Sequence, residues 1–366
     1  MASSPARIPL RRRIAYAAIV AVALLMVCEG ALRLRAWMRY GTTGDISDAL
    51  LVRDRESGLL VPRPGAALHG STIDIRINSL GFRGDEIERV KPARTLRIAC
   101  LGASTTFCAE VSSNRATWPA RLQARLQALY PQVRVEVINA GVPAYTAEES
   151  LRNLRHRVLP LGPDLVIYYE ANNEIARDTE TLAARQGLQV NDESGFVATL
   201  SKASLLFNLT YKNIAIRARG DGDHAIASIP RDLPARFIGL LDSMATELQQ
   251  RDVPLVLSTF VVKYRRTQDH PTQIANADVA FYYMPWMSID GLLDAMDVYN
   301  QAIVDFAGRR QLGVVDNRDA IPPDANHFRD CMHFTDRGAD AMADRFLTYL
   351  QRSGLIDRAL ARLGLS

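Results

Sequence analysis

The sequence predicts an α/β protein built on a parallel β-sheet that helices cover on both faces. After Pro92, short runs rich in apolar and β-branched residues alternate with segments whose apolar residues recur at helical spacing. Strands that alternate with helices favour a parallel sheet, and a parallel sheet is normally buried on both faces. The predicted strands are residues 95–102, 133–141, 164–170, 253–260 and 312–317.

Helices are predicted between and after these strands. The clearest is 120–130, ARLQARLQALY, where apolar residues fall on one helical face. Two long insertions interrupt the alternation, and such insertions are often lids or binding loops. Residues 176–228 are expected to be mostly helical. Residues 264–292 are expected to be irregular, with aromatic residues that either pack inside or line a substrate wall. The other predicted helices are 148–158, 234–251, 294–307 and 335–350.

The first 40 residues differ from the rest of the chain in charge and in hydropathy. They hold seven arginines and one acidic residue, whereas the remainder is close to neutral, which argues against a nucleic-acid-binding protein. Residues 14–28 carry no charge and follow Arg11, Arg12 and Arg13. We therefore expect residues 1–40 to be an N-terminal membrane anchor. A cleaved signal peptide and a buried soluble helix remain alternatives, although the residues after the apolar run form a poor cleavage site.

Basic residues before the apolar run slightly outnumber those after it. The positive-inside rule then places the N-terminus in the cytoplasm and the main domain outside it, in the periplasm. The expected organisation is a membrane anchor (1–40), an extended lead-in packed on the main domain (41–93), the α/β domain (94–352) and a C-terminal helical tail (353–366). Within the lead-in, residues 71–77 alternate in polarity and predict an edge strand.

Chemically active residues follow the predicted strands at the ends where ligands bind in open parallel sheets. Ser104 follows the first strand, Gly141 ends the second, and Asn173 follows the third. Asp330 and His333 lie in a loop after the fifth strand. A hydroxyl nucleophile, possible hydrogen-bond donors and a carboxylate–imidazole pair are what serine acyl transfer requires.

Two of these assignments have competitors nearby in the sequence. Asp324 and His327 have the same D-x-x-H spacing as Asp330 and His333, so spacing alone does not choose between the pairs. We favour the second pair because a predicted helix starts directly after it and would hold the ring at the sheet edge. Asn172 competes with its neighbour, and on an extended segment only one of the two can face the site.

Four sequence blocks resemble the SGNH/GDSL hydrolase superfamily. They are LGASTT, INAGVPAYT, YYEANNE and FRDCMHFTDRGAD, in the order found in that superfamily, and the resemblance covers about residues 96–350. It implies a three-layer α/β/α, flavodoxin-like domain. Three positions depart from the usual blocks without removing a catalytic atom. Ala103 replaces an aspartate, Ala171 replaces a glycine, and Glu174 replaces an aspartate.

The resemblance implies a serine esterase or acylhydrolase. Ser104 would be the nucleophile, His333 the general base, and Asp330 the residue that orients it. The oxyanion hole would combine the backbone N–H groups of Ser104 and Gly141 with the side-chain amide of Asn173. The implied substrate is a carboxylic ester, with an acetyl or acyl group on an envelope glycan, or a lipid-linked ester, as candidates. An acyltransferase that uses the same residues and a catalytically inactive envelope scaffold are the alternatives.

No cofactor, metal or nucleic-acid partner is expected. The remaining histidines are scattered along the chain, without a metal-ligand cluster. Four cysteines are too few for a disulfide-rich scaffold. Cys108 and Cys331 flank the predicted site, so a disulfide between them is one expectation and two unpaired thiols are the other. The histidines outside the two D-x-x-H pairs are His69, His156, His224 and His270.

Overall fold

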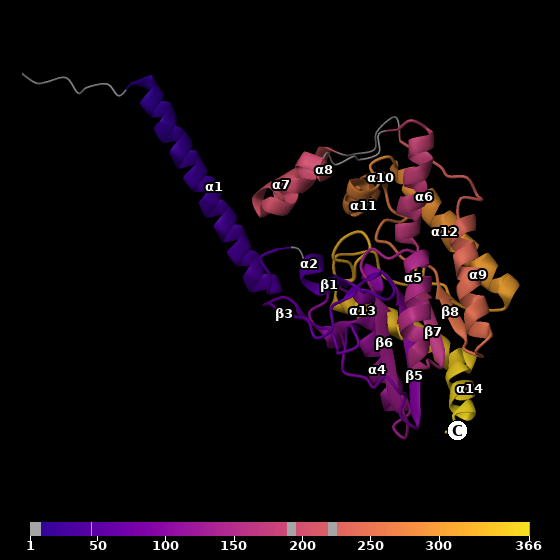
Figure 1. The fold of residues 1–366 in the computed structure, drawn as a ribbon. Coiled ribbons are helices and arrows are strands. Elements are labelled where there is room, and N and C mark those ends of the chain that lie inside the picture. Colours follow the sequence, from indigo (N-terminus) through magenta and orange to yellow (C-terminus); the bar gives the residue numbers. More distant parts are fainter. Residues whose placement is uncertain (1–8, 45, 189–194, 219–224, 366) are drawn as a thin grey trace, which may run out of the picture.

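A parallel sheet of five strands forms the centre of the protein (Figure 1). The computed structural model describes residues 9–44, 46–188, 195–218 and 225–365. The strand order is β6-β5-β7-β8-β9, so the chain starts inside the sheet and builds outward in both directions. All neighbouring pairs are parallel, which confirms the α/β prediction. The strands are β5 (Thr95–Gly102), β6 (Arg134–Gly141), β7 (Leu165–Tyr169), β8 (Leu255–Ser258) and β9 (Gly313–Val315).

Helices cover both faces of this sheet, so the domain has three layers. Helices α4 (Trp118–Leu129) and α13 (Asp336–Ser353) pack together on one face, where the Trp118 and Phe346 rings stack with centroids 4.7 Å apart. Tyr168 of β7 points to the other face and contacts Phe237. That layer comprises α5 (Ala147–Asn153), α9 (Ala235–Gln249) and α12 (Ile289–Arg310).

The lead-in contains two small antiparallel hairpins rather than a strand at the edge of the main sheet. Strand β1 (Leu51–Arg53) pairs with β2 (Leu60–Pro62), and β3 (Ala67–His69) pairs with β4 (Asp74–Arg76). The strand expected at residues 71–77 is thus present as β4, and its partner is β3 rather than a strand of the main sheet. A tight turn between β3 and β4 satisfies the hydrogen bonds of this run locally, so the main sheet is not needed as its partner.

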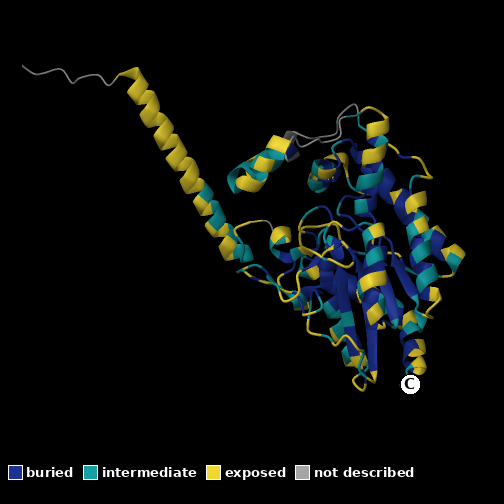
Figure 2. Cartoon of the chain, in the orientation of Figure 1, coloured by how far each residue is buried: buried dark blue, intermediate teal, exposed yellow. Residues whose placement is uncertain are grey.

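The N-terminal helix α1 (Leu10–Tyr40) extends away from the body of the protein. It has 31 residues, and its apolar side chains are exposed, in contrast to the buried strands (Figure 2). It is long and apolar enough to span a membrane, and by the same criteria it could be a signal sequence.

The first insertion is helical, as expected, and the second is more helical than the sequence indicates. The first contains α6 (Asn172–Arg185), α7 (Gly195–Ala203) and α8 (Leu205–Ala218) in its described parts. The second was expected to be irregular but forms α10 (His270–Asn276) and α11 (Asp278–Tyr283), because Asp269 caps the first of them through the Thr272 N–H. The remaining α-helices are α2 (Ile46–Leu50), α3 (Ser104–Phe107) and α14 (Leu355–Arg362), and single turns of other helix types occur at Asn114–Ala116, Leu154–Val158 and Leu159–Leu161.

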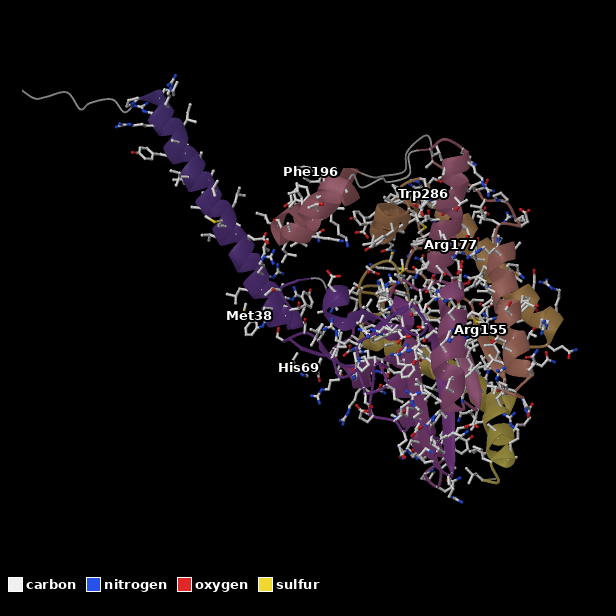
Figure 3. The ribbon with its side chains drawn as sticks, in the orientation of Figure 1. Met38, His69, Arg155, Arg177, Phe196 and Trp286 are labelled. Carbon is white, nitrogen blue, oxygen red and sulfur yellow. The ribbon has the colours of Figure 1, made fainter. Side chains whose placement is uncertain are left out.

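The aromatic residues of the second insertion divide between packing and exposure. Trp286 is buried, and its indole N–H donates to the hydroxyl of Thr179 at 3.1 Å (labelled in Figure 3). It therefore packs against α6 rather than lining an open wall. Tyr283 is exposed at the surface of α11.

Candidate active site

Ser104 stands at the first residue of α3, directly beyond the carboxyl end of β5. The turn depends on Gly102, whose φ of 152° is rarely adopted by other residues. A Cβ atom there would lie 2.3 Å from the backbone oxygen of Tyr169 on the neighbouring strand. Glycine thus allows the chain to leave the sheet sharply and to present the serine hydroxyl at its edge.

Gly141 ends β6 beside this turn. A Cβ atom at this position would lie 2.5 Å from the backbone nitrogen of Phe107, so the missing side chain lets α3 pack closely against the strand end. The N–H of Gly141 donates to the side-chain oxygen of Asn139 at 3.2 Å. The residue therefore lies beside the serine turn, and its N–H has an internal acceptor in this structure.

The structure brings together the serine, the histidine and the aspartate expected from the sequence. The Nε2 atom of His333 lies 2.8 Å from the Oγ of Ser104, and its Nδ1 atom lies 2.7 Å from Oδ2 of Asp330. The other Asp330 oxygen accepts the backbone N–H groups of His333 and Met332. With Nδ1–H donated to the carboxylate, Nε2 is free to accept the serine proton.

Burial and hydrogen bonding have opposite effects on the pKa values of Asp330 and His333. Burial favours the neutral form of Asp330, but hydrogen bonds from the His333 side chain and from two backbone N–H groups prevail and lower the carboxyl pKa. For His333, burial favours the neutral ring. The hydrogen bond and charge of Asp330, with smaller contributions from Glu110 and Glu170, prevail and raise the imidazole pKa.

The competing pair, Asp324 and His327, makes the same local contact. The Nδ1 atom of His327 lies 2.7 Å from Asp324 Oδ1, so D-x-x-H spacing produces an aspartate–histidine hydrogen bond at both places. The backbone of His327 accepts the N–H of Thr335 and lies against Gly338 at the start of α13. This pair therefore braces the helix entry, and the hydrogen bond to Ser104 comes from His333.

Asn173 lies in the first turn of α6, not on an extended segment as the sequence argument assumed. Its side-chain amide donates to the backbone oxygen of Tyr145 at 2.9 Å, which leaves the second amide hydrogen for another acceptor. The Tyr145 hydroxyl in turn donates to the backbone oxygen of Leu60 in β2. Asn172 is buried instead, and its Oδ1 has no hydrogen-bond partner within the described chain.

Glu170 is a buried carboxyl group behind the site that sequence reasoning did not single out. Its Oε1 accepts the N–H of Asn173 at 2.7 Å, and so fixes the start of α6. Burial raises its pKa to about 8 against the opposing effect of that hydrogen bond. In the sequence, this buried role is indicated only by a single acidic residue at the end of an otherwise apolar predicted strand.

Arg83 is a second supporting residue that the sequence did not reveal. Its guanidinium is buried and donates to the backbone oxygens of Phe107 and Cys108, at the end of α3. It also donates to Asn114, and burial lowers its pKa to about 10. The lead-in thus holds the C-terminal end of the short helix that begins with Ser104.

Of the two expectations for Cys108 and Cys331, the structure shows the unpaired thiols, and all four cysteines are free. The two thiols face different elements. Cys108 lies against Thr105 and the backbone of Trp118, whereas Cys331 lies against the backbone N–H of Ala280 in α11. Bringing the histidine loop beside the serine turn does not bring these two side chains together.

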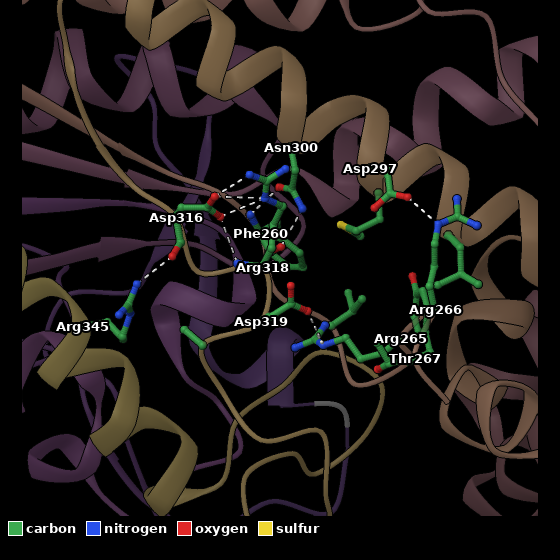
Figure 4. Close-up of a pocket in the computed structure, with 15 residues that line it drawn as sticks. Phe260, Arg265, Arg266, Thr267, Asp297, Asn300, Asp316, Arg318, Asp319 and Arg345 are labelled. Atoms are coloured by element: carbon green, nitrogen blue, oxygen red, sulfur yellow. Dashed lines mark hydrogen bonds and ion pairs between the residues drawn. The ribbon is translucent and has the colours of Figure 1, made fainter. Parts of the chain in front are cut away.

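A cavity of about 550 Å³, lined by both charged and apolar side chains, opens beyond the ends of β8 and β9 (Figure 4). Phe260 forms part of its wall, and its rim carries the ion pairs Arg318–Asp316 and Arg266–Asp297. None of the serine–histidine–aspartate set lines this cavity. The part of the chain that the structure describes contains no cluster of three or more residues suited to hold a metal ion.

An α/β/α sheet with this arrangement at its carboxyl edge defines the class of the protein, the ester hydrolases of the SGNH/GDSL type. The chain belongs to the GDSL-like lipase/acylhydrolase family, whose sequence model matches residues 100–341. It is therefore an acylhydrolase. No curated protein matches the sequence.

Solved structures of similar proteins share little sequence identity with this chain. An α/β hydrolase enzyme from the metagenome of Lake Arreo, Spain, is 17% identical, and the match covers 70% of this chain and 95% of that one, with a TM-score of 0.44. The acetylxylan esterase Axe2 from Geobacillus stearothermophilus is 16% identical over 70% and 94%, with a TM-score of 0.44. A protein of the G-D-S-L family from Desulfitobacterium hafniense is 14% identical over 69% and 99%, with a TM-score of 0.41.

Proposed function

We propose that the protein is a membrane-anchored serine esterase whose catalytic residues are Ser104, His333 and Asp330. The observation that carries this proposal is the continuous hydrogen-bonded path from the serine hydroxyl through the imidazole to the aspartate. The raised pKa of His333 makes it a stronger base for the serine proton.

The reaction begins when Oγ of Ser104 attacks the ester carbonyl carbon and Nε2 of His333 takes the hydroxyl proton. The tetrahedral intermediate collapses, the bond to the alcohol oxygen breaks, and His333 returns the proton to the alcohol. Water then attacks the acyl-enzyme with the same histidine as base, which releases the acid and restores the serine. Asp330 keeps the imidazole in the required tautomer and stabilises its charged form.

The negative charge of the tetrahedral intermediate requires donors that are already in place. We assign this role to the backbone N–H groups of Ser104 and Gly141 and to the free amide hydrogen of Asn173. The contact of Asn173 with Tyr145 supports the assignment because it orients the amide. Gly141 would have to release or share its present bond to Asn139 when substrate binds.

The substrate that we propose is an acetyl or acyl ester on an envelope glycan, outside the cytoplasm. Two observations support this location. The apolar helix α1 is suited to hold the chain in a membrane, and the preceding arginines favour the main domain outside.

The proposal is tested by labelling the full-length protein with a fluorophosphonate probe, which reacts with activated serines. Labelling and ester hydrolysis are expected in the natural protein and not in Ser104→Ala. The variant should unfold at the same temperature, because one hydroxyl at the protein edge contributes little to stability. Undiminished labelling of Ser104→Ala would refute the assignment. Adding a glycan acceptor to the assay separates hydrolysis, which releases free acid, from acyl transfer.

A further inference from the structure

Helices α7 and α8 form a hairpin beside α1 that differs from the rest of the surface (Figure 1). Residues 195–215 contain Lys202 and Lys212 but no acidic residue, and most of the others are apolar or small. Phe196 is 72% exposed and Ile214 is 61% exposed. Exposed apolar side chains together with basic charge are typical of helices that lie on membrane surfaces.

The turn of this hairpin is fastened to α1 by Glu29. The carboxylate accepts the hydroxyl of Ser204 and the backbone N–H groups of Leu205 and Leu206 at 2.8–2.9 Å, and so caps the start of α8. Arg33, one turn further along α1, pairs with Glu29 at 2.6 Å and donates to the backbone oxygen at the end of α7. These contacts fix the hairpin at one position along the axis of α1, beside Glu29 and Arg33.

This position along α1 is also where the uncharged stretch of the helix ends. Residues 14–28 carry no charge, and Glu29 is the next residue. A helix that spans a membrane brings its first charged residue to the headgroup region. The hairpin that Glu29 caps must then lie at the same level.

The hairpin also connects the anchor to the candidate active site. The ammonium group of Lys212 on α8 lies over the rings of Tyr282 and Tyr283 on α11, within 5.5 Å of their centroids. Helix α11 in turn contacts Cys331, between the proposed aspartate and histidine. Figure 1 shows α1, α7 and α8 on the side of the body toward which the strands point.

We propose that α7 and α8 form an interfacial hairpin that lies in the headgroup layer of the membrane holding α1. The inference rests on α1 being a membrane anchor. Phe196 and Ile214 enter the lipid boundary, while Lys202 meets anionic headgroups. The hairpin then fixes the orientation of the domain, with the carboxyl edge of the sheet turned toward the bilayer. Esters displayed close to the membrane surface would reach the site most readily.

The test uses the full-length chain with Cys28→Ser, so that the remaining natural cysteines are the buried ones. A fluorescent NBD label is attached at Phe196→Cys or at Ile214→Cys. The matched control is Val90→Cys, an apolar residue that is 82% exposed just before β5, at the opposite edge of the sheet. Each protein is placed in nanodiscs of phosphatidylcholine and phosphatidylglycerol, with or without doxyl-labelled lipid as a quencher.

Lipid quenching should reduce emission at least about twofold at both hairpin positions and leave the control unchanged. Absence of quenching at either hairpin position, or a chain that does not remain in the nanodisc, would overturn the proposal. The Ser104→Ala background should give the same quenching. The result is therefore independent of the esterase reaction, and failure of one proposal can be told from failure of the other.

Discussion

The Nε2 atom of His333 lies 2.8 Å from the Oγ of Ser104, although 229 positions separate the two residues in the chain. Ser104 is placed by the turn after β5, and His333 by the loop that leads into α13. Tyr169 stacks between Phe260 and Phe334 and so packs the region behind this meeting point. The proposed chemistry thus depends on a strand-end turn and a helix-entry loop that pack against a shared core.

Replacing His333 by alanine should reduce kcat by roughly 10³-fold or more, because the serine loses its base. His327→Ala is the matched control, since it removes a histidine with the same aspartate spacing and hydrogen bond. It should lower the melting temperature and leave kcat near the natural value. Steady-state kinetics and thermal unfolding of both variants check this. A larger kcat loss in His327→Ala would mean that the base had been misassigned.

The pH profile of kcat/KM should have an acidic limb centred above 6.5, the ordinary histidine pKa. The base must be neutral, and the contacts of His333 raise its pKa, so the ring stays protonated and inactive to a higher pH. Asp330→Asn removes the largest contribution that raises this pKa, while Glu110 and Glu170 remain. The limb should then move to lower pH while the maximal rate falls. An unchanged limb in Asp330→Asn would assign it to another group.

Asn173→Ala should lower kcat by about 10²–10³-fold, the usual effect of losing one oxyanion donor. KM should change little because the interaction forms in the transition state. Asn172→Ala is the control, since its side chain is buried and its oxygen lacks a partner. Its kcat should stay close to the natural value. Equal losses in both variants would point to damage at the start of α6 rather than to a lost donor.

Arg83→Met should reduce both stability and activity. Two backbone oxygens at the end of α3 would lose the guanidinium as a donor, and each lost hydrogen bond is worth about 0.5–1.5 kcal/mol. Neither oxygen is left unsatisfied, because the Phe107 oxygen keeps the Asn139 amide and the Cys108 oxygen keeps the Val111 N–H. Arg83→Lys keeps the charge but lacks the branched guanidinium donor. Its stability and activity should therefore lie between those of the natural protein and those of Arg83→Met. Chemical denaturation and kcat are the measurements. Full stability of Arg83→Met would show that water replaces the guanidinium there.

The strand positions could be predicted from the sequence because each strand is a nearly continuous apolar run, and such runs are buried in parallel sheets. The helices of residues 264–292 could not, because their start depends on a single cap at Asp269. The supporting roles of Glu170 and Arg83 could not be predicted from the sequence either. Nothing local in the sequence shows that a charged side chain will be buried against a distant backbone.

The sequence by itself determined the α/β sheet, the family and the small set of residues from which the candidate site is built, because strand ends in a parallel sheet converge on one edge. Only the tertiary structure decided which of two identical Asp-x-x-His pairs reaches Ser104, that the Asn173 amide bonds to the backbone of Tyr145, and that Cys108 and Cys331 stay apart. Local spacing sets the aspartate–histidine bond within each pair. The direction in which each ring or thiol points depends on the packing of helices and loops that are remote in the chain.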